Sequence, residues 1–88
     1  MIYKVGDNMK LNEHLKEYLK SHKIKQSELV DLLNNSNTLD NKRYNRATMC
    51  RMIKGTTELG IVDILNICNV LNGTMNEIFG IKVRYEYE

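Results

Sequence analysis

The sequence predicts an all-α domain of five short helices, with a short N-terminal strand and a C-terminal β-strand. Apolar side chains recur with the 3.6-residue period of a helix through most of the chain, and proline, which breaks helices, is absent. After Gly80 the period changes to two, which is typical of a half-buried strand. With 88 residues, 42% of them apolar, the chain is long enough for one core. We therefore expect a single domain over residues 1–88, with a core at 9–80 and a strand tail at 81–88.

Two helices are expected in the first third of the chain. The first spans about 9–21, and its apolar stripe consists of Leu11, Leu15, Tyr18, Leu19 and His22. Either Asp7 or Asn8 is suited to cap its start. The second spans 26–34, and its apolar cluster consists of Ile24, Leu29, Val30, Leu32 and Leu33. Its start is defined to within two residues, because Lys25 is a poor N-cap and Ser27 is a good one.

A loop and a third helix follow. Residues 34–45 are rich in asparagine and contain a single aliphatic side chain, Leu39, which indicates a loop. Asn45 is a good N-cap for a helix over 46–54, and Gly55 ends that helix. Tyr44 precedes the cap at the position from which it can pack on Met49.

The last third of the chain predicts two helices and the strand tail. The fourth helix spans about 61–72, stops at Asn72 and Gly73, and has one apolar face made of Ile61, Ile64, Leu65, Cys68 and Leu71. A capping box from Thr74 to Glu77 opens the fifth helix, 74–79, whose core residues are Met75, Ile78 and Phe79. We expect the tail to pair with the β-prone residues 1–5 or with a second chain, because one strand cannot satisfy its own backbone groups.

Charge is distributed unevenly along the chain, although the net charge is only +2. Residues 10–54 carry ten Lys and Arg against five acidic residues, whereas residues 55–88 carry two against five. An anionic partner is therefore expected to approach the first two thirds of the chain.

Several classes of function are not indicated by the sequence. It lacks a Gly-rich phosphate loop, a nucleophile elbow and paired carboxylates beside a histidine, so we do not expect an enzyme. Cys50 and Cys68 are far apart, and His14 and His22 are eight residues apart, so we expect no disulfide, metal or cofactor. No apolar run reaches the roughly 20 residues of a membrane span, and no secretory signal or sensor domain is evident. We expect a cytoplasmic protein without a membrane partner or a small-molecule ligand.

Two stretches of the chain resemble a known family. Residues 15–30 (LKEYLKSHKIKQSELV) resemble its first helix, turn and start of the second helix, and the matching positions are Ile24, Gln26, Leu29 and Val30. Residues 46–79 fit its recognition helix, a glycine and two further helices without a gap, and the matching positions are Met49, Met52, Gly55, Ile61, Ile64, Ile67, Leu71, Ile78 and Phe79. From Leu11 to Phe79 the sequence resembles the lambda-repressor-like helix-turn-helix family, which contains Cro and the cI repressor.

The chain departs from the family pattern at three points. About nine extra residues, roughly 35–43, are inserted between the second and third helices, so the resemblance does not define the angle between those helices. Many members pair an Arg on the first helix with a Glu on the recognition helix, whereas this chain has Leu19 and Ile53, a joint replacement that a packed core tolerates. Lys25 stands where the family usually has a Ser or Thr cap.

The resemblance implies that helix 46–54 enters the major groove of double-stranded DNA. Arg46 and Arg51 are then expected to bind guanine and Ala47 to touch a thymine methyl, flanked by Asn45 and Thr48. In the family, the residue matching Gln26 meets a phosphate. The other expected phosphate contacts are Ser27, Lys25, Lys54, Thr56, Lys42 and Arg43.

Taken together, these features predict a sequence-specific DNA-binding transcriptional regulator, a repressor of phage or mobile-element type. Because one such module reads only a few base pairs, we expect a homodimer, joined by the fifth helix and the strand 81–87 unless that strand pairs within its own chain. The alternative is a protein-interaction module, such as an antitoxin-like partner, with secondary DNA binding.

Overall fold

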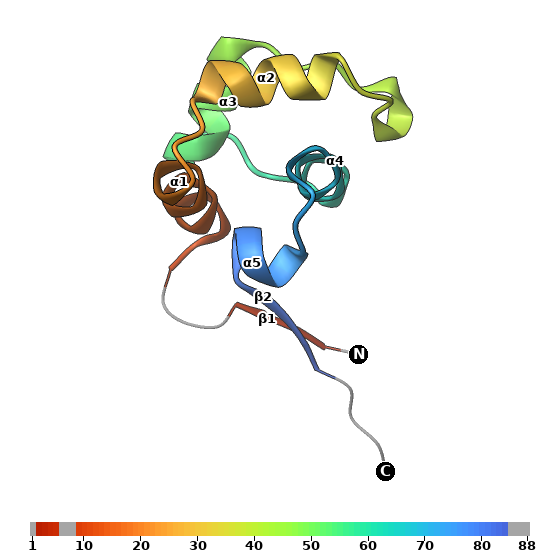
Figure 1. Ribbon diagram of the computed structural model, residues 1–88. Coiled ribbons are helices and arrows are strands. Elements are labelled where there is room, and N and C mark those ends of the chain that lie inside the picture. Colours follow the sequence, from red (N-terminus) through yellow and green to blue (C-terminus); the bar gives the residue numbers. More distant parts are fainter. Residues whose placement is uncertain (1, 6–8, 85–88) are drawn as a thin grey trace.

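Five α-helices make up most of the described chain, which confirms the predicted mostly helical class. The computed structural model describes residues 2–5 and 9–84 (Figure 1). In chain order its elements are β1 (Ile2–Val5), α1 (Leu11–Ser21), α2 (Gln26–Asn34), the 3-10 helix η1 (Leu39–Asn41), α3 (Arg46–Lys54), α4 (Ile61–Leu71), α5 (Met75–Phe79) and β2 (Ile81–Arg84).

The first two helices begin without a side-chain cap. The N-cap of α1 is Lys10, so the cap predicted at Asp7 or Asn8, which lie outside the described residues, is wrong. The N-cap of α2 is Lys25 rather than Ser27. In both helices a carboxylate three residues after the cap accepts from the cap's own backbone N–H: Glu13 at 3.4 Å and Glu28 at 3.3 Å. The negative charge of the carboxylate also interacts favourably with the positive end of the helix dipole, which compensates for the missing side-chain cap.

The caps predicted for α3, α4 and α5 are confirmed. Asn45 accepts a hydrogen bond from the Thr48 N–H at 2.7 Å, and Thr74 accepts one from the Glu77 N–H at 3.1 Å. Asn72 ends α4 in the left-handed region, with φ of 54°. Gly55 ends α3 with φ of 87°, a conformation that side chains disfavour.

The helices surround one core, with α3 packed between α1 and α2 on one side and α4 and α5 completing the other (Figure 1). The core residues are Leu15, Leu19, Leu29, Val30, Leu33, Tyr44, Met49, Met52, Ile53, Leu59, Ile64, Ile67, Cys68, Ile78, Phe79 and Ile81. Tyr44 and Met49 both belong to it, as their predicted pairing requires. His22, predicted on the core stripe of α1, is instead exposed and stacks on the Tyr18 ring at 3.9 Å between centroids.

The buried face of α4 differs from the predicted one. Ile61 and Leu65 are 57% and 40% exposed, so their assignment to the core is wrong. Asp63 and Asn66 face inward in their place and are nearly fully buried. This arrangement is stable because both polar side chains find hydrogen-bond partners in the chain that precedes α3. Leu32 of α2, also predicted in the core, is 43% exposed.

The two ends of the described chain form a small antiparallel ribbon. Val5 of β1 lies opposite Ile81 of β2, and Ile2 lies opposite Arg84. The backbone groups of each strand are thereby paired within one chain along one edge, and α5 packs against β2. The remainder of the predicted tail, residues 85–88, lies outside the described residues.

Candidate nucleic-acid interface

The third helix has one face in the core and one in solvent. Met49, Met52 and Ile53 are at most 3% exposed and anchor α3 against α1 and α2. Ala47, Arg51 and Lys54 are all exposed, and their spacing of four and three residues places them on one stripe of the helix. The stripe therefore points away from the core.

The first turn of α3 adds the other predicted base-contacting residues. The side chain of Arg46 is exposed and makes no hydrogen bond or ion pair within the described residues. Asn45 is also exposed, but its side-chain oxygen is used by the Thr48 N–H. Thr48 is half-buried, and its hydroxyl lies 3.4 Å from Nη2 of Arg51. The structure thus brings together all five residues predicted for base contact, with both guanidinium groups at the surface.

The start of α2 lies beside the end of α3. Gln26 of α2 and Ile53 of α3 line one shallow groove, together with Lys16 and Lys20 of α1. Lys25 and Gln26 are exposed and Ser27 is half-buried. Lys16 and Lys20 were not among the predicted residues. Their position on the polar side of α1, in the basic part of the chain, was the available signal, but only the folded chain places them next to Gln26.

The groove is also lined by Leu19 and Ile53, the two apolar residues that stand where the family resembled by the sequence often has an Arg and a Glu. Leu19 and Ile53 are 4% and 3% exposed. Two apolar side chains at this point bury hydrocarbon without the desolvation cost of an ion pair. The side-chain contact between α1 and α3 at this groove is therefore apolar.

The turn after α3 is held close to α1. The Asn12 side chain donates to the Ile53 carbonyl at 3.0 Å, which satisfies one of the carbonyl groups left open at a helix end. A Cβ at Gly55 would lie 2.9 Å from Nδ2 of Asn12, so a side chain at this position would displace Asn12. Thr56, a predicted phosphate contact, is exposed and donates to the Arg51 carbonyl at 3.2 Å.

The inserted residues 35–43 lie beyond the end of α2 and fold against α4, away from the part of α3 that packs on α1 (Figure 1). Arg43 is exposed, with Nη1 donating to the Asn34 carbonyl at 2.8 Å, and it keeps further donors toward solvent. Lys42 is different because its ammonium group binds Asp63 at 2.5 Å. This charge neutralises a buried carboxylate, so we remove Lys42 from the candidate phosphate contacts.

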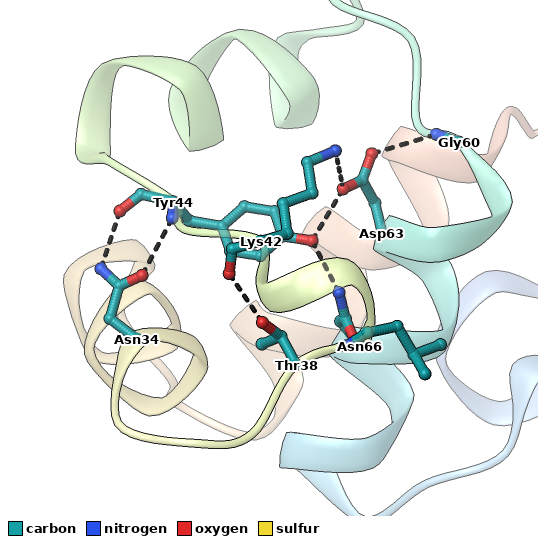
Figure 2. Close-up of polar contacts among 8 residues, drawn as sticks. Asn34, Thr38, Lys42, Tyr44, Gly60, Asp63 and Asn66 are labelled. Atoms are coloured by element: carbon teal, nitrogen blue, oxygen red, sulfur yellow. Dashed lines mark hydrogen bonds and ion pairs between the residues drawn. The ribbon is translucent and has the colours of Figure 1, made fainter.

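A buried polar network, which the sequence does not predict, connects the insertion and Tyr44 to α4 (Figure 2). The Tyr44 hydroxyl donates to Asp63 at 2.7 Å and accepts from Asn66 at 3.1 Å. The carbonyl oxygen of Asn66 accepts from the Leu39 N–H at 2.8 Å, and Asp63 also accepts from the Gly60 N–H at 3.2 Å. Among the described residues, no buried side-chain nitrogen or oxygen lacks a partner. The available signal was the occurrence of Asp63 and Asn66, one helical turn apart, in a helix whose only other polar residue is Asn69.

The network shifts the pKa of its two titratable members in opposite directions. Burial raises the pKa of Tyr44 to about 12, and the hydrogen bond to Asp63 adds to this effect while that from Asn66 opposes it. For Asp63, burial opposes ionisation, but the hydrogen bonds from Lys42, Tyr44 and Gly60 outweigh it and lower the pKa of the carboxyl group. Asp63 is therefore an anion and Tyr44 a neutral donor at neutral pH.

Over residues 2–5 and 9–84, no three His, Cys, Asp or Glu side chains are grouped so that they could hold a metal ion. In the same ranges, no helix has the length and apolar character needed to cross a bilayer. Cys68 is buried, which raises the pKa of its thiol.

Comparison with protein-family models, with curated proteins and with solved structures gives no match for this chain.

Proposed function

We propose that this chain is a lambda-repressor-like helix-turn-helix protein that binds double-stranded DNA in a sequence-specific manner and regulates transcription, as a repressor of phage or mobile-element type. α2 and α3 are its helix-turn-helix pair, and α3 is the recognition helix. The chain forms a single domain in this proposal, with the helical core at 9–80 and the strand tail at 81–88.

The observation that carries the proposal is the division of α3 into a buried and a solvent face. The buried face fixes the helix on the core through Met49, Met52 and Ile53. The solvent face carries Arg46 and Arg51, whose planar groups match the O6 and N7 acceptors of guanine. A helix of this size fits the roughly 12 Å width of the major groove.

The surrounding basic and polar groups supply the phosphate contacts. Lys25, Gln26 and Ser27 lie at the N-terminus of α2, where backbone N–H groups and the helix dipole favour an anion. Lys54 and Thr56 lie at the C-terminal end of α3, and Arg43 lies at the end of the insertion. Lys16 and Lys20 extend this surface along α1.

We also propose that the protein binds DNA as a homodimer on two half-sites about 34 Å apart. Because β2 pairs with β1 along one edge, a dimer interface formed by the tail would use the opposite edge of β2. Deletion of residues 81–88 followed by mass measurement in solution tests this interface: we expect loss of the dimer, and an unchanged dimer would assign the interface to another surface.

Selection of bound duplexes from a random pool, followed by salt titration on the selected duplex, tests the proposed function. We expect a palindromic consensus and a steep loss of affinity with salt, about 10³- to 10⁵-fold between 50 and 200 mM for six to ten phosphate contacts. Recovery of random sequences would contradict the proposal.

A second candidate function is a protein-interaction module of the antitoxin-like kind, in which DNA binding is secondary. It is favoured by the exposed apolar side chains of α2, η1 and α4, which are Leu32, Leu39, Ile61 and Leu65. Burial of these side chains under a partner would stabilise a complex without phosphate contacts. Affinity for such a partner is expected to depend weakly on salt, which distinguishes it from DNA binding.

A further inference from the structure

We propose that Asn34 and Tyr44 are positioning residues for α3. They hold the start of α3 in a fixed place relative to α2 and α4 across the inserted residues 35–43. The functional part of this inference rests on the proposed DNA binding, whereas its structural part does not.

The first element of the arrangement is a two-point clasp at the base of the insertion. Nδ2 of Asn34 donates to the Tyr44 carbonyl at 2.7 Å, and Oδ1 of Asn34 accepts from the Tyr44 N–H at 2.9 Å. One side chain at the end of α2 thus satisfies both backbone groups of the residue that precedes the α3 cap. A flexible connection of this length only weakly restricts the position of α3 relative to α2. The two hydrogen bonds of the clasp restrict that position, as a short turn would in their place.

The second element fixes Tyr44 in a different direction. Tyr44 is 5% exposed and belongs to the core, and its hydroxyl bridges Asp63 and Asn66 of α4. Tyr44 is therefore held through its backbone by α2 and through its side chain by α4. Asn45, the next residue, caps α3. These contacts act within two residues of the first turn of α3.

The third element ties the insertion itself to the same two residues of α4 (Figure 2). Leu39 donates its N–H to Asn66, and Lys42 binds Asp63. The Lys42 carbonyl accepts from the Thr38 hydroxyl at 2.7 Å, which closes the loop on itself. Because the inserted residues are anchored on α4, they do not come between α2 and α3.

Precise placement of α3 matters more for base contacts than for phosphate contacts. A bidentate contact between an arginine and a guanine requires correct distance and direction, whereas a lysine near a phosphate tolerates displacement. Loss of the clasp is therefore expected to reduce the preference for the selected duplex and to leave binding to random DNA nearly unchanged. A residue that acts only on stability would not change this ratio at a temperature where the protein is fully folded.

The test compares Asn34→Ala with two controls in the 88-residue chain. Asn35→Ala removes a neighbouring exposed side chain that has no hydrogen bond within the described residues. Ile78→Val removes one methyl group from the core on α5, so it lowers stability without removing either hydrogen bond of the clasp. Two quantities are measured well below the melting temperature: the ratio of affinities for selected and random duplexes, and amide hydrogen exchange of residues 46–50.

We expect Asn34→Ala to lower the affinity ratio by about 2- to 30-fold, the range typical of changes in a coupling network. We also expect faster exchange at 46–50 than in α1, while both controls leave the affinity ratio and the relative exchange as in the unaltered protein. An unchanged ratio in a protein that does select DNA would overturn the positioning role and leave the proposed function intact. Absence of selection by the unaltered protein would overturn the proposed function, and unaltered exchange at 46–50 would then overturn the structural part as well.

Discussion

The hydroxyl group of Tyr44 donates a hydrogen bond of 2.7 Å to the carboxylate of Asp63, and both side chains are buried. The two residues are 19 positions apart, one immediately before the α3 cap and the other in the first turn of α4. This contact joins the inserted loop, the start of α3 and the inner face of α4 in one network.

Replacement of Tyr44 by phenylalanine is expected to lower the free energy of unfolding by about 1 to 3 kcal/mol, because it leaves the buried Asn66 amide without its acceptor. Tyr18→Phe is the matched control, since the Tyr18 hydroxyl has no hydrogen bond within the described residues. Urea unfolding of both variants measures the difference. Equal effects of the two substitutions would show that the network contributes little.

Stability is expected to fall in acid through Asp63. Its pKa is lowered in the folded state, so its contribution is fully present above the unfolded-state pKa of about 3.8 and is lost as the pH falls from there through the folded-state pKa. Asp63→Asn removes this titration while keeping a polar side chain. The free energy of unfolding, measured from pH 7 to pH 2.5, should therefore depend less on pH in Asp63→Asn than in the unaltered protein. Parallel curves would contradict the assignment.

Substitution of Gly55 by alanine is expected to destabilise the protein by about 1 to 2 kcal/mol through the left-handed backbone conformation alone. The new Cβ would also displace Asn12 from the end of α3. Gly60→Ala is a suitable control, because Gly60 has an ordinary extended conformation and space for a Cβ. Thermal unfolding of both variants checks this, and similar melting temperatures would argue against the strain at Gly55.

Replacement of Lys54 by alanine is expected to weaken binding to all DNA sequences alike and to reduce the salt slope by about one. The reason is that a phosphate contact carries charge but no sequence information. Affinities for selected and random duplexes at several salt concentrations provide the measurement. Glu58→Gln is a charge-altering control beyond the end of α3, and it should not lower affinity. A loss confined to the selected duplex would instead place Lys54 against a base.

The helices were predictable from the sequence because their signals are local. The apolar period of α1, the Asn45 cap, the terminating Gly55 and the Thr74 capping box each depend on residues within one or two turns. The sequence predicts the start of α1 at residue 9, two residues before its true start at Leu11, because no side-chain cap marks Lys10.

The inner face of α4 was not predictable in the same way. Periodicity favoured Ile61 and Leu65 for the core, but the structure buries Asp63 and Asn66. Their partners are 19 to 27 residues away in sequence, so only the folded loop reveals that these polar groups are satisfied. For the same reason the sequence did not separate Lys42, which binds Asp63, from Arg43, which reaches the surface.

The candidate site was predictable where it coincides with one helix. Arg46, Ala47 and Arg51 are exposed together because the buried positions 49, 52 and 53 orient the whole of α3. The additional lysines, Lys16 and Lys20, come from another helix and required the packing of α1 on α3.

The most direct test of the central proposal, that α3 reads base pairs in the major groove, is a base-by-base comparison of the duplexes selected by the unaltered protein and by Arg46→Ala. We expect the variant to lose about 1 to 3 kcal/mol of binding free energy and to relax its preference at one base pair of each half-site, with the other positions unchanged. An unchanged consensus, or an equal loss of affinity for selected and random duplexes, would contradict the placement of α3 in the groove.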